Sequence, residues 1–174
     1  MSQETIQLAE YAACLRFEDL PPAVVQRAKD CIADTAAAII YGNTIPWSAT
    51  VIDYARRMGP GGKSNILGAG GATAQPAMAA LANGTLSHAF ELDNVVINPG
   101  AGVHGGATLL PPGLAMAQEA GGSGRDLLAA VVAGAEVMIR IGWATKHTNE
   151  VNGFHAKPRR GPKFFQCAAY GDVG

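Results

Sequence analysis

Residues 122–142 read GSGRDLLAAVVAGAEVMIRIG, and this stretch decides the fold class. Its apolar residues recur every three or four positions, which is the spacing of one face of an α-helix. Ser123 with Asp126 three residues later is typical of a capped helix start, and Glu136 and Arg140 are spaced to pair across one turn. The stretch predicts a long helix reaching about residue 143, with a core face made of Leu128, Val131, Ala135, Met138 and Ile139.

Working outward, helical patterns separated by proline and glycine turns continue over most of the chain. They predict further helices over about 3–17, 22–42, 47–58, 74–90 and 107–120. Residues 64–67 are the one short strand-like run, and no βαβ alternation, internal repeat or heptad pattern is present. The expected fold class is therefore all-α, a helical bundle-like domain with at most one minor strand.

Several local features sharpen these expectations. Gly42 is expected to be the C-cap of the second helix, and Thr73 the N-cap of the fourth. The glycine-rich segment 94–106 is expected to be a loop, and Pro111–Pro112 to kink the following helix or delay its start. The second helix is apolar all round from Ala33, so its second half is expected to be buried. The third is expected to pack through one face, made of Trp47, Val51, Tyr54 and Met58.

Composition limits the classes of function. The chain has 174 residues, 48% of them apolar and 16% charged, with a formal net charge of -1. This balance offers no basic face for nucleic acid, and the apolar stretches are too short to span a bilayer. The N-terminal residues carry Glu4 and Glu10 where an export signal carries basic residues. Three distant cysteines, Cys14, Cys31 and Cys167, predict neither a disulfide framework nor a zinc site. We expect a cytoplasmic protein that binds neither nucleic acid nor membrane.

The candidate chemistry centres on His104. It lies in the glycine-rich run PGAGVHGGA (99–107), just before an expected helix. Glycines let the backbone approach a ligand closely, and helix N-termini favour anions. A histidine there can hold a substrate carboxylate or move a proton near neutral pH.

Acidic residues end the helix upstream of this loop. Glu91 and Asp93 oppose the helix dipole there, which indicates a role as base, hydrogen-bond partner or orienter of His104. A solvated helix end is the alternative. His88, taken alone, reads as a packing histidine, whereas His155 is again a histidine in a loop.

Four motifs in order resemble the MmgE/PrpD family, which includes 2-methylcitrate dehydratase, cis-aconitate decarboxylase and iminodisuccinate epimerase. They are LANGTLSHAFELDN (81–94), VHGGATLLP (103–111), the long helix 122–142 and GFH (153–155). The spacing agrees from about Gln7 to His155, nearly the whole chain.

The resemblance implies a large helical domain covered by a smaller α+β lid, acting on small di- and tricarboxylic acids without metal or organic cofactor. It implies catalytic roles for His104, His155, Asp93 and Glu91. It also implies substrate-binding roles for three of their neighbours, His88, Asn94 and Gly105. Homodimers are common in the family, so a homodimer is expected.

The chain departs from the family pattern at three places. The run Asp93-Asn94-Val95 stands where Asp-Asp-Thr is usual, which removes one polar contact to substrate, and Gly105 stands where proline is usual. From Ala156 onward the pattern is lost, and the lid residues are absent. We therefore expect an incomplete helical domain over 1–155 and a divergent tail over 156–174, arising from truncation or a shifted reading frame.

Three functions are compatible with these residues. The first is a lyase that dehydrates a small polycarboxylic acid by proton transfer beside a carboxylate, as 2-methylcitrate dehydratase does. The second is an isomerase that epimerises an iminodisuccinate-like dicarboxylate. The third is a catalytically inactive helical remnant.

Overall fold

The computed structural model describes residues 3–98 and 101–151, and within them the all-α class is confirmed. A 3-10 turn at Phe17–Asp19 links the first two helices. Two short antiparallel ladders join β1 (Ser64–Asn65) to β2 (Thr73–Ala74) and β3 (Val96–Asn98) to β4 (Ala101–Val103). The helices are α1 (Gln3–Cys14), α2 (Pro22–Gly42), α3 (Ser48–Met58), α4 (Pro76–Ser87), α5 (Gly105–Ala120) and α6 (Gly124–Val151).

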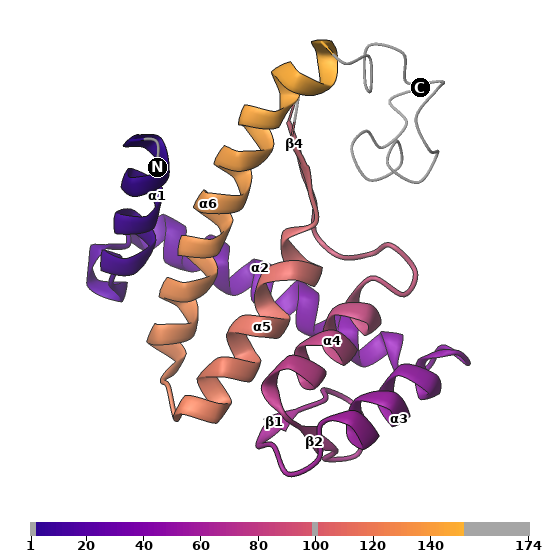
Figure 1. Ribbon diagram of the computed structural model, residues 1–174. Helices are drawn as coiled ribbons and strands as arrows, with labels where there is room; N and C mark the ends of the chain where they lie inside the picture. Colours follow the sequence, from indigo (N-terminus) through magenta and orange to yellow (C-terminus); the bar gives the residue numbers. More distant parts are fainter. Residues whose placement is uncertain (1–2, 99–100, 152–174) are drawn as a thin grey trace.

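The helices form two connected parts around α2 and α5 (Figure 1). The first half of α2 lies with α1 and α6, and its second half lies against α4. The pair α4 and α5 makes the most extensive helix packing, with α3 and the β1–β2 ladder closing the end of that part. The β3–β4 hairpin rises from the start of α5 along α6. The loop between α4 and this hairpin therefore passes the point where α2, α5 and α6 meet.

The core is built largely from small residues, which lets the helix backbones approach closely. At Gly42 a side chain would collide with the backbone of Leu86. Gly42 belongs to α2, and the C-cap is Asn43 in right-handed helical conformation. Our C-cap prediction for Gly42 was therefore wrong, because close packing against α4 explains the glycine. The fully buried cluster comprises Ile39, Ala55, Ile66, Ala74, Ala79, Ala82, Leu86, Leu110 and Ala115.

The β1–β2 ladder changes where α4 begins. Thr73 pairs with Asn65 instead of capping a helix, and α4 starts after Gln75 with Pro76 in its first turn. Buried Asn83 of α4 holds the ladder, since its Oδ1 accepts from Leu67 N at 3.0 Å and its Nδ2 donates to Asn65 O at 2.9 Å. The strand predicted at 64–67 is present only at Ser64–Asn65, and its partner strand was missed.

Four further expectations were wrong in whole or in part. Segment 94–106 contains a hairpin, in which Val96 pairs with Val103. Helix α5 begins at Gly105 with Pro111 and Pro112 inside it, so the prolines do not delay its start, and the alternative of a kink stays a prediction. The expected core face of α3 is largely exposed, as are Ile40 and Tyr41 at the end of α2, and α3 is buried through Ala55 and Ser48. The exposed fractions are 62% for Trp47, 48% for Tyr54 and 60% for Met58.

Helix α6 begins as predicted. The backbone N–H of Ser123 donates to Asp126 Oδ2 at 2.8 Å, and Asp126 N–H donates to Ser123 Oγ at 3.3 Å. Arg140 pairs with Glu136 at 2.8 Å. The helix continues to Val151, beyond the expected end near residue 143. Among the described residues, no helix has the length and hydropathy needed to cross a membrane.

Candidate functional site

The loop that follows α4 carries a buried carboxylate into the centre of the molecule. Helix α4 ends at Ser87, and the chain then turns through Glu91, whose φ of 57° is left-handed. A residue other than glycine adopts this region only where its surroundings hold it there. The turn brings Asp93 inward, with its side chain 0% exposed.

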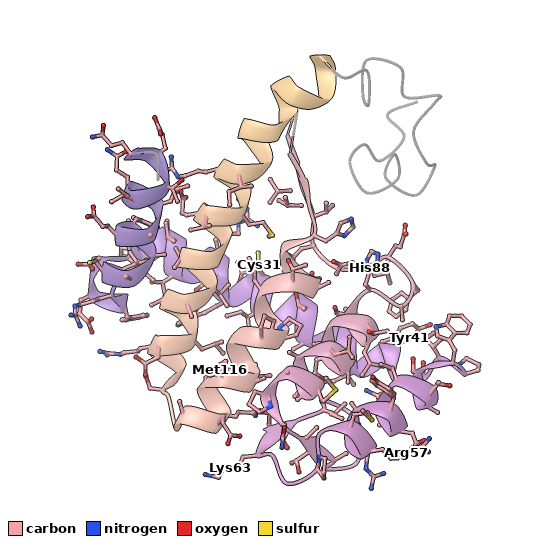
Figure 2. All side chains as sticks on the ribbon, viewed as in Figure 1. Cys31, Tyr41, Arg57, Lys63, His88 and Met116 are labelled. Carbon is pink, nitrogen blue, oxygen red and sulfur yellow. The ribbon has the colours of Figure 1, made fainter. Side chains whose placement is uncertain are left out.

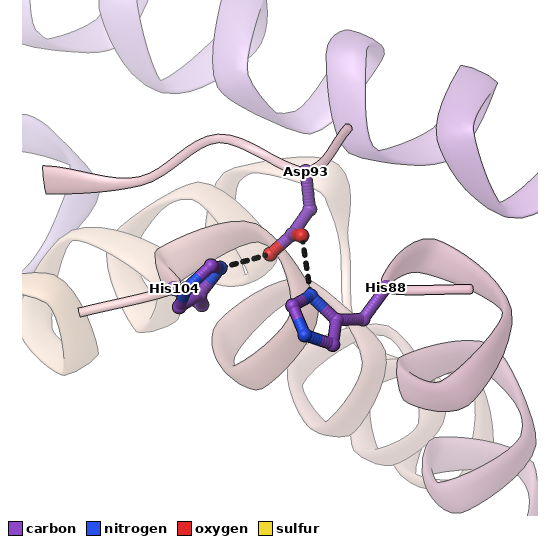
Figure 3. A group of neighbouring side chains, drawn as sticks. All are labelled: His88, Asp93 and His104. Carbon is purple, nitrogen blue, oxygen red and sulfur yellow. Dashed lines mark hydrogen bonds and ion pairs between the residues drawn. The ribbon is translucent and has the colours of Figure 1, made fainter. Parts of the chain in front are cut away.

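Two imidazoles share this carboxylate (Figure 3). His88 Nδ1 lies 2.8 Å from Asp93 Oδ1, and His104 Nδ1 lies 3.2 Å from Asp93 Oδ2. The two rings meet edge to face, with centroids 4.8 Å apart. Three residues spread over 17 positions thus form one cluster at the end of α4 and the start of α5.

The contacts at Asp93 suit one tautomer of each ring. An ionised carboxylate only accepts hydrogen bonds, so it pairs with imidazoles that present Nδ1–H to it. When His104 is neutral, its Nε2 then carries the lone pair and can accept a proton. Among the described residues His104 Nε2 is the one buried side-chain polar atom without a hydrogen-bond partner. A buried acceptor left in this way is suited to a substrate proton or hydroxyl group.

The elements around the cluster hold it firmly. His104 is the N-cap residue of α5, and its carbonyl accepts from Thr108 Oγ1 at 2.6 Å. The next residue after Asp93 is Asn94, whose Nδ2 lies 2.8 Å from Thr35 Oγ1 and 3.2 Å from Cys31 O. These contacts tie the loop to α2, so the carboxylate and His104 are positioned by three helices.

A cavity of about 290 Å³ lies next to the cluster in the fold. It begins at Asn94 and Gly105, the residues that follow Asp93 and His104, and runs between α2, α5 and α6. Figure 2 labels Cys31, which lines the cavity, and His88, which belongs to the cluster. The cavity lining is chiefly aliphatic and includes none of the three cluster side chains. We therefore place the candidate chemistry at the cluster, because proton transfer needs the titratable groups found there.

The structure brings together some of the predicted site residues and not others. His104, Asp93 and His88 meet in the cluster, while Glu91 is exposed on the turn. A Cβ on Gly105 would meet its nearest neighbours at 3.7 Å, so the backbone there does not require glycine. His155 lies outside the described residues.

Sequence reasoning missed the contribution of α2. Thr35 is 1% exposed and contacts Asn94, yet it lies 59 residues away along the chain. The signal available was a polar residue at a core position of an apolar helix. Buried polar side chains need a partner, and that requirement points to an interaction with another segment.

Comparison with known proteins identifies a family whose members resemble this chain. The model of the MmgE/PrpD N-terminal domain matches residues 6–161. The chain is 31% identical over 162 residues to the cis-aconitate decarboxylase-like protein oryM of Aspergillus oryzae, covering 88% of the chain and 33% of that relative. It is also 31% identical over 157 residues to cis-aconitate decarboxylase of Aspergillus terreus, covering 87% of the chain and 31% of that relative. The chain thus spans about one third of the length of these relatives. No solved structure matches.

Proposed function

The chain belongs to the MmgE/PrpD family, and from that premise we propose that it carries the proton-transfer part of a lyase site for a small di- or tricarboxylic acid. The observation that carries the proposal is the hydrogen bond between Asp93 and His104 Nδ1, which leaves the buried Nε2 without a partner. The curated relatives named cis-aconitate decarboxylase support a tricarboxylic acid as substrate.

The proposed chemistry is proton transfer at a carbon beside a carboxylate. In a dehydration, His104 Nε2 takes the proton from carbon and the hydroxyl group leaves from the neighbouring carbon as water after protonation. In a decarboxylation, the C–C bond electrons remain on carbon as CO₂ leaves, and His104, protonated beforehand from solvent, donates a proton to that carbon. Both reactions need a general acid or base placed at the reacting carbon.

Asp93 supports either direction of transfer. When His104 gains a proton at Nε2, the carboxylate 3.2 Å from Nδ1 stabilises the imidazolium. The rings and carboxylate are already in contact before substrate binds, so little reorganisation is needed during the reaction. We propose that His155 supplies a second acid–base or carboxylate-binding group, and that the protein acts as a homodimer without an organic cofactor.

Two measurements on the purified chain test the proposal. The first is thermal unfolding with citrate, 2-methylcitrate, cis-aconitate or iminodisuccinate at millimolar concentration. A ligand at ten times its Kd stabilises the fold by about 1.4 kcal/mol, which raises the midpoint by roughly 3–6 °C. The second is NMR detection of deuterium uptake from D₂O at the carbon beside a carboxylate, which reports proton transfer without complete turnover.

His104→Gln is the informative variant. Glutamine can still donate to Asp93 but cannot exchange a proton, so deuterium uptake should fall at least about 100-fold while the fold survives. Asp53→Asn, an exposed site paired with Arg57, is the matched control and should leave uptake unchanged. Uptake that persists in His104→Gln rejects the assignment of the base. Uptake with inversion at that carbon favours the epimerase, and a folded wild-type chain without uptake or ligand shift favours the inactive remnant.

A further inference from the structure

We propose that His88, Asp93 and His104 also form a binding site for one divalent transition-metal ion of the zinc and cobalt class. One candidate ligand atom from each residue lies within 4.8 Å of the others. Two imidazole nitrogens and a carboxylate oxygen are the donor set that such ions take in proteins. The inference does not depend on the proposed lyase function, since it rests on the ligand geometry alone.

The two nitrogen–oxygen distances in the cluster are close to those between ligands of one ion. Nitrogen and carboxylate oxygen ligands lie about 2.0–2.2 Å from zinc, so two neighbouring ligands are about 3.0–3.4 Å apart at angles between a right angle and a tetrahedral one. The Nδ1–oxygen distances at Asp93 are 2.8 Å to His88 and 3.2 Å to His104. The two nitrogens face different oxygens of Asp93, and the candidate ligand atoms lie within 4.8 Å of one another. An ion can therefore bind between them after side-chain shifts that bring the three ligand atoms closer, with the proton of each ring moving from Nδ1 to Nε2.

Electrostatics favours an ion in that position. The Asp93 side chain is 0% exposed, and an ionised carboxylate removed from water is stable only when hydrogen bonds or positive charge surround it. The two imidazoles provide hydrogen bonds to it. A divalent ion between the carboxylate and the two rings would add positive charge there directly.

The site is also built in advance and accessible. Asn94, the residue after Asp93, is hydrogen-bonded to Thr35 of α2, and His104 is the N-cap residue of α5. The His88 side chain is 34% exposed, so the cluster has a route from solvent. Three protein ligands leave at least one coordination position for water or a substrate carboxylate.

Metal binding and proton transfer exclude one another at this cluster. The ion occupies the Nδ1 atoms, so the single proton of neutral His104 must move from Nδ1 to Nε2. That nitrogen then donates to a bound anion instead of accepting a proton from carbon. An ion of this class is therefore expected to act as an inhibitor of the proposed reaction rather than as its cofactor.

Titration of the metal-free chain with Co²⁺ and with Zn²⁺ tests the site without any activity. We expect Co²⁺ to develop visible absorption bands at one ion per chain, and calorimetry to give one Zn²⁺ site that Mg²⁺ does not occupy. His88→Gln and His104→Gln should each weaken Zn²⁺ binding by at least about 10-fold. His88→Gln is the main variant because its side chain is partly exposed, and circular dichroism verifies its fold.

Asp53→Asn is again the control and should bind as the wild type does. The proposal is overturned if the wild-type chain takes up no Co²⁺ or Zn²⁺ at 1:1, or if His88→Gln and His104→Gln bind with unchanged affinity. Deuterium uptake measured on chelator-treated protein separates the two proposals. Uptake without metal binding rejects only the metal site, whereas metal binding without uptake rejects only the lyase function.

Discussion

Replacing Asp93 by asparagine tests the central feature of the site, a buried carboxylate that two imidazoles share. The substitution keeps the size and shape of the side chain. It replaces one accepting oxygen by an amide that donates, so one imidazole Nδ1–H faces another donor. The bonds at stake are those of 2.8 Å to His88 and 3.2 Å to His104.

The magnitude follows from these two bonds. A hydrogen bond to a charged group contributes about 1.5–3 kcal/mol, and a buried donor left unsatisfied costs about 1–3 kcal/mol. One imidazole can reduce the loss by moving its proton to Nε2 and accepting from the new amide. We therefore expect Asp93→Asn to lower the free energy of unfolding by about 2–4 kcal/mol, which lowers Tm by roughly 4–16 °C in a chain of this size.

Urea unfolding followed by circular dichroism measures the free energy, and ¹⁵N chemical shifts of the histidine rings report the tautomers. Asp53→Asn is the control, because Asp53 is exposed and its pair with Arg57 on α3 contributes only about 0.3–0.5 kcal/mol. An Asp93→Asn variant within about 0.5 kcal/mol of the wild type, with both rings still protonated at Nδ1, refutes the shared ionised carboxylate.

Three other perturbations follow from the packing. Gly106→Ala places a Cβ 2.6 Å from the buried hydroxyl oxygen of Thr35, whereas a Cβ at Gly105 is 3.7 Å from its nearest atom. Thermal unfolding should therefore show a loss of stability of about 1–3 kcal/mol for Gly106→Ala and none for the control Gly105→Ala. Asn83→Ala removes both side-chain bonds to the β1 segment and should cost about 2–4 kcal/mol by urea unfolding; a loss under 1 kcal/mol argues against that anchor. The pKa of Asp126 is held below 3.8 by hydrogen bonds from the backbone and hydroxyl of Ser123, so its stabilisation is present above that pH and lost as pH falls through the lowered pKa. Asp126→Asn should flatten this acid-limb dependence, and an unchanged pH profile contradicts the assignment.

Local pattern was sufficient for most helices because each boundary is marked within a few residues. At α6 the hydrogen bonds between Ser123 and Asp126 mark the start of the helix. At α2 the start is marked by Pro22 in the first turn, without a side-chain cap. The start of α4 was misplaced because Thr73 pairs with Asn65. Strand pairing between segments is a long-range property that the periodicity of one segment does not report.

Burial was harder to predict than helix position. The apolar face of α3 was expected to be the core face, yet Trp47 and Met58 are mostly exposed and Ala55 is completely buried. Small residues decide how close two helices come, whereas hydropathy ranks large side chains highest. The same reasoning explains Gly42, whose lack of a side chain lets α2 approach Leu86.

The cluster was predicted only in part. The resemblance indicated His104 and Asp93, and the dipole argument proposed an acidic orienter for that histidine. The shared role of His88 was not visible, because it depends on the left-handed turn at Glu91. A local pattern does not show which way a turn directs the next three side chains, so Glu91 and Asp93 looked equivalent in the sequence.

Asn94 shows how a departure from a family pattern changes meaning once its neighbours are known. In the sequence it is part of Asp93-Asn94-Val95, which stands where Asp-Asp-Thr is usual, and that change was interpreted as the loss of one polar contact to substrate. In the structure its Nδ2 lies within 3.2 Å of Cys31 O and Asp34 Oδ2, and 2.8 Å from Thr35 Oγ1. A carboxylate has no hydrogen to donate to these oxygens, and it would face the like charge of Asp34. The amide therefore suits the surface of α2. Because Asn94 directly follows Asp93, its contacts with α2 help to hold the Asp93 carboxylate in place, and this role needs no contact with a substrate.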